Sequence, residues 1–384
     1  MSSLEKERHA TWLELFYDLV FAAAVSQIGH LLYVNNSSIT AFLGTASLFV
    51  PVYWAWIGVT FYSTRFETDD LIHRLMVLLQ MMGAAALTIN IHDALSETSG
   101  NFAISYAAIR AFLVFEYIRA GRKVPAARTL ANSYAQGFFL STILWMISAI
   151  IPTPIRFIIW ALALAIDITT TILVGKKHAH LAPNIFHLPE RMGLFTLIVL
   201  GETIFGLVSS LSDHKWSIES TISIGAGLSI AFSLWWMYFD SIDGSPIRAF
   251  REKGRIGVYT TWLYIHFPLV VGLVATATGI RYVVSSAQNV ALSYTGEWLI
   301  CSSVSLCLFS IGIIQFSIAI ASDGDKKKVI IQESVYRSIA GFVIILIPTL
   351  TISALPLVLI LIISIICIIQ IILDLRRHPH HRIF

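Results

Sequence analysis

Residues 155–174 read IRFIIWALALAIDITTTILV, a long apolar run in which only Arg156 and Asp167 are charged. A helix of about 20 residues rises about 30 Å, which matches the thickness of the hydrocarbon core of a bilayer. Similar runs recur along the 384 residues, of which only 13% are charged, against roughly 25% in a soluble domain. With a mean hydropathy of +0.75, the sequence predicts an all-α polytopic membrane protein and excludes a water-soluble enzyme.

Charged, Pro-rich and Asn/Ser-rich breaks divide the chain into twelve predicted spans. They cover residues 10–33, 39–62, 72–96, 102–120, 132–151, 155–174, 190–211, 217–240, 256–283, 294–321, 332–352 and 354–375. With this alternation, 21 of the 26 Lys and Arg residues fall on one side of the membrane, 3 on the other and 2 within spans. The positive-inside rule therefore predicts a multi-pass protein with both termini in the cytoplasm.

The spans are expected to form two six-helix halves, residues 1–175 and 190–375, followed by a basic cytoplasmic tail at 376–384. Sliding the first span onto the seventh places Glu14 on Glu190 and Ser26 on Glu202. Because six is an even number, the two halves would be parallel repeats, an arrangement known among transporters. Chance similarity between two apolar helices explains the match equally well.

Four ionisable residues lie deep inside predicted spans, where an uncompensated charge is costly. They are Glu202, Arg110, His266 and Asp167. We expect Glu202 and Arg110 to form an ion pair near the middle of the bilayer, and Pro268 to kink the helix that carries His266. Together the four residues are a candidate substrate or proton site, although a purely structural ion pair would also explain the first two.

A second polar group lies near the cytoplasmic end of the first span. Glu14 and Asp18 are one helical turn apart on the same face, from which they could meet Arg74 at the start of the third span. The group is either a structural clamp or a cation or proton acceptor at a cytoplasmic mouth. Gln27 and His30 lie on a different face, near the external end of the same span.

The sequence contains none of the common phosphate-binding or metal-binding motifs of soluble enzymes. We find no Gly-rich phosphate loop, no metal-binding spacing of Cys and His, and no HExxH motif. The three cysteines lie in apolar runs, and the residues HPHHR at 378–382 fit a basic tail beside lipid headgroups. We therefore expect no metal, no cofactor and no nucleic-acid partner.

Two long motifs resemble a known family. RHATWLELFYDLVFAAAVSQIGHLL at 8–32 and HLPERMGLFTLIVLGETIFGLV at 187–208 are similar to motifs of the bacterial low temperature requirement A (LtrA) family. The resemblance covers nearly the whole chain and implies a many-helix protein of the bacterial inner membrane. It marks as motif residues Glu14, Asp18, Gln27, His30, Arg74, Glu190, Arg191, Gly201 and Glu202. With these positions included, the polar cluster expected on the cytoplasmic side comprises Glu14, Asp18, Arg74, Glu190 and Arg191. The resemblance implies no particular substrate or reaction.

Three classes of function are compatible with these features. A secondary transporter, or an ion- or proton-conducting protein, is favoured by the intramembrane charges and the predicted parallel halves. The alternatives are an intramembrane enzyme acting on a lipid or binding a cofactor, and a structural protein for membrane adaptation without turnover. The expected partners are membrane lipids and a small solute or proton, and a homo-oligomer stays open. The sequence identifies no catalytic residue.

Overall fold

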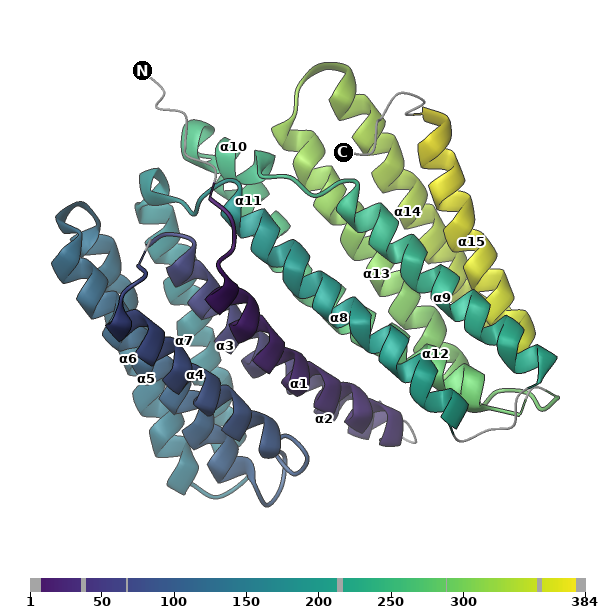
Figure 1. Ribbon diagram of the computed structural model, residues 1–384, viewed down its shortest axis with the longest axis horizontal. Coiled ribbons are helices and arrows are strands. Elements are labelled where there is room, and N and C mark those ends of the chain that lie inside the picture. Colours follow the sequence, from purple (N-terminus) through teal and green to yellow (C-terminus); the bar gives the residue numbers. More distant parts are fainter. Residues whose placement is uncertain are drawn as a thin grey trace. The chain divides into compact units, whose positions relative to one another are not determined.

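The computed structural model describes residues 8–35, 39–66, 68–212, 217–287, 289–350 and 354–377 (Figure 1). All regular elements in these ranges are helices, and 12 helices in them are long and apolar enough to cross a membrane. The predicted all-α polytopic architecture is therefore confirmed. Most of the predicted tail, from residue 378 onward, lies outside the described residues.

The helices form two compact units. Unit 1 contains the described residues up to Leu31, together with Leu43–Arg191 and Ile247–Ile256. Unit 2 contains Leu32–Phe42, Met192–Pro246 and the described residues from Gly257 onward. The main boundary between the units follows Arg191, close to the start of the predicted second half. Each unit also includes a short segment from elsewhere in the chain. The relation of the two predicted halves as parallel repeats stays a prediction.

Unit 1 is built on helices that follow one another in the chain. It holds most of α1 (Trp12–Val34), all of α3 (Phe49–Ser63), α4 (Leu71–Ile89), α5 (Ser99–Lys123), α6 (Arg128–Ile150) and α7 (Ile155–Lys177), the first turn of α8 (His187–Ser212) and most of α10 (Ser245–Lys253). Helix α5 packs against α4, α6 and α3, and α6 also packs against α7 (Figure 1). The 3₁₀ turns η1 (Pro125–Ala127) and η2 (Ala179–Leu181) lie in the connections.

Helix α3 lies in the core of unit 1. All of its residues except Val50 are buried. A helix that is apolar around its whole circumference is stable only inside other protein or lipid, and α3 is of this kind. Its few polar groups are therefore held away from water, where each needs a hydrogen-bond partner.

Two predicted spans are each interrupted three residues before a proline. The second is divided into α2 (Ile39–Ser47) and α3, and the ninth into α11 (Ile256–Tyr264) and α12 (His266–Ser285). Proline has no N–H to bond the carbonyl four residues earlier. Pro51 therefore leaves the carbonyl of Ser47 without its helical bond, and Pro268 does the same to that of Tyr264, the residue at which α11 ends. The ninth span is therefore interrupted at the place where the kink was expected.

Unit 2 consists of most of α8, α9 (Ile218–Phe239), α11, α12, α13 (Tyr294–Ala321), α14 (Gly324–Leu350) and α15 (Pro356–Arg377). Helix α13 packs against α12 and α14, and α9 packs against α15 (Figure 1). A buried ion pair joins α14 to α15, where Arg337 Nη2 lies 2.5 Å from Asp374 Oδ2 and Nη1 lies 3.1 Å from Oδ1.

Candidate functional site

The first buried polar group joins the start of α1 to the start of α8, and we call it the α1–α8 cluster: Glu14, Asp18, His187 and Arg191. Arg191 Nη2 donates to Asp18 Oδ1 at 2.6 Å, and Arg191 Nη1 lies 3.6 Å from Glu14 Oε1. His187 Nε2 lies 3.2 Å from Glu14 Oε2. Each helix contributes two residues one turn apart, so both pairs point to the same side of their helix. One guanidinium therefore serves two buried carboxylates.

Helix α3, in addition to α1 and α8, makes hydrogen bonds with this cluster. Trp56 Nε1 donates to Asp18 Oδ1 at 2.7 Å, and Arg191 Nη2 also lies 3.4 Å from Thr60 Oγ1. Asp18 is 0% exposed and Arg191 is 1% exposed. Burial of charges at this level is sustained only by close pairing and hydrogen bonding.

The expected partner of Glu14 and Asp18 was Arg74, and this expectation is wrong. Arg74 Nε donates instead to Asp69 Oδ1 at 2.8 Å, and the Arg74 side chain is 61% exposed. The cation at the two carboxylates is Arg191. Sequence spacing fixes which residues share one helix face, but it does not decide which other helix packs there.

Three further residues expected from the first and seventh spans, Glu190, Gln27 and His30, do not belong to the α1–α8 cluster. Glu190 is half-buried and accepts a hydrogen bond from the Ala10 backbone N–H at 3.1 Å. Gln27 is half-buried and His30 is exposed. His187, which the sequence analysis did not single out, is 0% exposed. Its position one turn before Arg191 is the signal that could have identified it.

A second buried group lies near the middle of two spanning helices in unit 1. Arg110 Nη2 lies 2.7 Å from Asp167 Oδ2, and the Tyr106 hydroxyl donates to the same oxygen at 3.1 Å. The Arg110 guanidinium also lies 4.4 Å from the centre of the Phe138 ring, a cation–π contact. A Cβ atom at Gly58 would lie 2.3 Å from Arg110 Nη1, so a larger residue at this position of α3 would displace the guanidinium group.

The expected ion pair between Arg110 and Glu202 is corrected by this arrangement, because the carboxylate against Arg110 is that of Asp167. At 1.5 Å per residue, Arg110 is about 16 Å from the start of α5 and Asp167 about 18 Å from the start of α7. Both therefore lie near the centre of their spans, as the sequence analysis placed them. Glu202 belongs to unit 2, where it is half-buried in α8.

A third group, which we call the His–Glu couple, was missed by the sequence analysis. His73 Nδ1 lies 2.6 Å from Glu116 Oε1, and Gln80 Nε2 donates to Glu116 Oε2 at 3.1 Å. Glu116 is 0% exposed and His73 is 7% exposed. The signal was available, since Glu116 lies in the same apolar run as Arg110, six residues further on. The Tyr62 ring of α3 stacks on the His73 ring at 6.1 Å.

Asp70 fixes the position of His73 at the start of α4. Its carboxylate accepts from the His73 backbone N–H at 2.9 Å, as an N-cap does, and from Lys123 Nζ at 2.6 Å and Arg119. The hydrogen bond from Lys123, with that N-cap bond and Arg119, holds the pKa of Asp70 well below its usual value. Asp70 thus joins the start of α4 to the end of α5, beside the His–Glu couple.

The three groups are arranged around α3. Trp56 and Thr60, which hold the α1–α8 cluster, are about 40° apart on the helix, as are Gly58 and Tyr62, which touch the other two groups. The two sets face in directions about 160° apart. All three groups therefore lie against α3 within unit 1.

His266, the remaining expected site residue, lies in unit 2. It is 2% exposed, and its Nδ1 donates to the Trp262 carbonyl at 2.7 Å. Its ring makes edge contacts with Tyr238 and Trp262. Arg110 and Asp167 are thus brought together by the structure, whereas Glu202 and His266 belong to the other unit. In the described part of the chain, no group of three or more His, Cys, Asp or Glu residues could hold a metal ion.

The fold and the buried groups define an all-helical membrane protein with many spanning helices and charged side chains inside its bundle. A family model described as bacterial low temperature requirement A protein (LtrA) matches residues 9–372. The chain belongs to this family. An uncharacterized protein of Rhizobium meliloti (strain 1021) is 26% identical over 290 residues, which cover 70% of this chain and 68% of that protein.

Proposed function

We propose that the protein is a proton-coupled secondary transporter of the bacterial inner membrane, with both termini in the cytoplasm and its ion path in unit 1. The support comes from the energetics of its buried charges. The desolvation of a buried ion pair often costs more free energy than the attraction between the charges returns, and apolar residues in its place are often as stable or more so. Unit 1 nevertheless holds three such groups inside spanning helices. Ionisable residues in such positions commonly belong to ion or proton pathways.

The His–Glu couple is the observation that carries the proposal. A buried carboxylate beside an imidazole is electrically neutral as a pair only when it holds one proton, on either partner. The short distance between His73 Nδ1 and Glu116 Oε1, 2.6 Å, allows the proton to be shared. Gain or loss of a proton changes the charge of the pair by one unit.

The position of the couple fits a path that leads inward. Asp70, at the surface end of α4, has a side chain that is 39% exposed. Glu116 lies about 9 Å along α5 from Arg110, near the middle of the span. We assign the pair of Arg110 and Asp167 to the solute-binding region. A change in the charge of the His–Glu couple would alter the electrostatic potential there, because the medium between them has a low dielectric constant.

Replacing Glu116 with glutamine tests the proposal. The amide is uncharged, keeps the shape of the side chain, and can still accept from Gln80 and donate to His73. Proteoliposomes with an acidic exterior would be offered a panel of labelled amino acids, inorganic anions and inorganic cations. We expect the wild type to accumulate one class of solute in a pH-dependent way. The rate of this pH-dependent uptake should be at least about a hundredfold lower in Glu116→Gln.

The matched control is Glu97→Gln, which removes an exposed carboxylate from the connection between α4 and α5. It should transport as wild type does. Undiminished pH-driven uptake by Glu116→Gln would contradict the assignment of the couple, and a wild-type protein that moves none of the panel would contradict the proposed transport function.

A further inference from the structure

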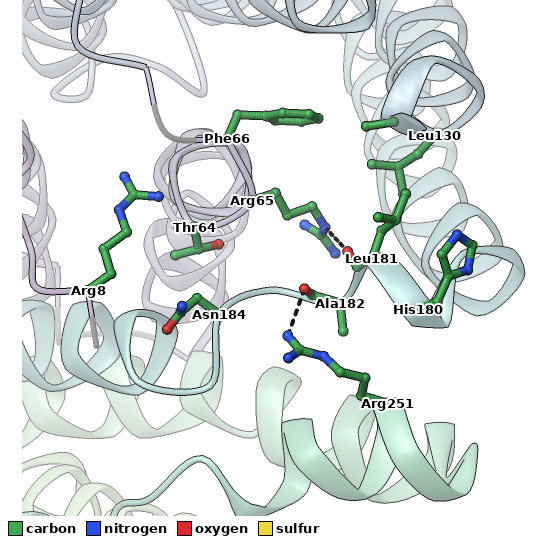
Figure 2. Close-up of a pocket in the computed structure, with 11 residues that line it drawn as sticks. Arg8, Thr64, Arg65, Phe66, Leu130, His180, Leu181, Ala182, Asn184 and Arg251 are labelled. Atoms are coloured by element: carbon green, nitrogen blue, oxygen red, sulfur yellow. Dashed lines mark hydrogen bonds between the residues drawn. The ribbon is translucent and has the colours of Figure 1, made fainter. Parts of the chain in front are cut away.

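Four exposed cations lie at one end of three neighbouring helices of unit 1. We call them the basic end: Arg122 at the end of α5, Arg128 at the start of α6, and Lys176 and Lys177 at the end of α7. Helix α6 packs against both α5 and α7 (Figure 1). Leu130, near the start of α6, and Leu181, in the turn η2 that follows α7, line the same pocket (Figure 2). The sequence analysis assigns this end to the cytoplasmic side.

Contacts between the helices bring the four side chains to one level. Arg128 Nε donates to the carbonyl of Gly121 at 3.4 Å, and Gly121 directly precedes Arg122 in the last turn of α5. A Cβ atom at Gly175, the residue before Lys176, would lie 3.7 Å from the Tyr134 hydroxyl of α6. The basic end is therefore one surface that all three helices share.

Carboxylates leave the charge of this surface unbalanced. Asp70, which joins the start of α4 to the end of α5, pairs with Arg119 and Lys123. Among the described residues, none of the four cations of the basic end forms an ion pair with an aspartate or glutamate. The C-terminal ends of α5 and α7 contribute about half a negative charge each, and the start of α6 about half a positive charge. Most of the repulsion among the four cations therefore remains, and a bound anion would relieve it.

An exposed apolar face of α7 leads to the basic end. Of the 12 spanning helices in the described part of the chain, α7 is the least buried, at 22%. The side chains of Ile158, Leu162 and Leu173 are 68%, 53% and 60% exposed. At 3.6 residues per turn, these three residues and Lys176 lie within about 60° of one another around the helix. A lipid against this face would have its acyl chains on apolar side chains and its headgroup beside Lys176.

The number of cations narrows the class of lipid. A zwitterionic phospholipid has no net charge, and one phosphodiester supplies a single negative charge against four positive ones. A headgroup with two phosphates balances more of the surface and can reach more than one helix. The guanidinium groups of Arg122 and Arg128 are suited to phosphate, since their planar forks make paired hydrogen bonds with two oxygens. Basic surfaces between spanning helices on the cytoplasmic side commonly bind lipids of this kind.

We propose that the basic end binds an anionic phospholipid with two phosphates in its headgroup, and that the acyl chains of this lipid lie along the exposed face of α7. The surface is independent of the proposed transport function, because it includes neither the His–Glu couple nor the pair of Arg110 and Asp167. It gives unit 1 a defined lipid partner at the end of the helices that carry Arg110 and Asp167.

Native mass spectrometry of the full-length protein in neutral detergent tests the proposal. The probes are cardiolipin, phosphatidylglycerol and phosphatidylcholine, whose headgroups contain two phosphates, one phosphate without a counter-charge, and one phosphate with a counter-charge. We expect the wild type to retain cardiolipin most strongly and phosphatidylcholine least. Combining Lys176→Gln with Lys177→Gln should weaken the retention of cardiolipin at least about tenfold, because each lysine near the headgroup adds to the attraction.

The matched control combines Lys326→Gln with Lys328→Gln. It removes two exposed lysines that the sequence analysis assigns to the same side of the membrane, but these lie 3.3 Å from Asp243 Oδ2 and 3.4 Å from Asp325 Oδ1, respectively. This variant should retain cardiolipin as the wild type does. If the variant of Lys176 and Lys177 does not fold, Arg128→Gln takes its place with a loss in the same direction. Equal losses in the two double variants, or retention of phosphatidylglycerol or phosphatidylcholine as strong as that of cardiolipin, would overturn the proposal.

Discussion

Asp167→Asn is expected to lower the free energy of unfolding by about 3–5 kcal/mol, the usual cost of removing one partner from a buried ion pair. The change leaves the Arg110 guanidinium, which is 1% exposed, without a counter-charge near the middle of its span. The Tyr106 hydroxyl can still donate to the asparagine oxygen, so the loss reports the charge and not that hydrogen bond. Titration with a denaturing detergent in mixed micelles, followed by tryptophan fluorescence, measures the effect.

The double variant Arg110→Leu with Asp167→Leu separates charge from packing. Because it removes both charges together, it should recover part of the loss that Asp167→Asn causes. Asp69→Asn is the control, since Asp69 forms its ion pair with Arg74 at an exposed site and such pairs contribute little to stability. If Asp167→Asn were as stable as Asp69→Asn, the pair would not have the buried, charged character described above.

Arg191→Gln is expected to have an effect at least as large. Among the described residues, Arg191 is the one cation in direct contact with both Glu14 and Asp18, and its removal leaves both carboxylates buried in the same cluster. We expect a loss of about 3–5 kcal/mol or more in the free energy of unfolding, because a buried charge without a partner is strongly destabilising. The same detergent titration measures it.

Two further variants of the α1–α8 cluster make this prediction specific. Arg191→Lys should recover little, because a single ammonium group cannot reach both carboxylates as the guanidinium fork does. Combining Asp18→Asn with Arg191→Gln should recover part of the stability, because it removes the buried negative charge of Asp18 that Arg191 no longer balances. A single variant Arg191→Gln with wild-type stability would show that Arg191 does not hold the cluster together.

The spanning helices could be predicted from the sequence because their length is set by the membrane. Any apolar run of about 20 residues crosses the hydrocarbon core, and the alternation of Lys and Arg checks the count. Pro268 indicated a break in its helix for an equally local reason, because proline has no backbone N–H. Helix α10 (Ser245–Lys253) was not predicted, because a nine-residue amphipathic helix gives too short a pattern to distinguish from a charged loop.

The pairing of buried charges could be predicted only in part. The depth of Arg110 and Asp167 followed from their places along their helices, but their contact depends on which helices become neighbours. For the same reason the sequence offered Arg74 as the partner of Asp18, where the structure has Arg191. Glu116 was overlooked although it lies in the same apolar run as Arg110, because its partner, His73, is on another helix and the sequence does not show which helices become neighbours.

The most direct measurement is that of the protonation of Glu116 in the His–Glu couple. Infrared difference spectra of the purified protein, taken between an acidic and an alkaline buffer, reveal carboxyl groups that gain or lose a proton. Our account predicts a carboxyl C=O band, shifted by exchange into D₂O, that is present in wild type and in Glu97→Gln and absent in Glu116→Gln. Spectra of wild type and Glu116→Gln that coincide in this region would show that Glu116 exchanges no proton, and would contradict the proposed coupling.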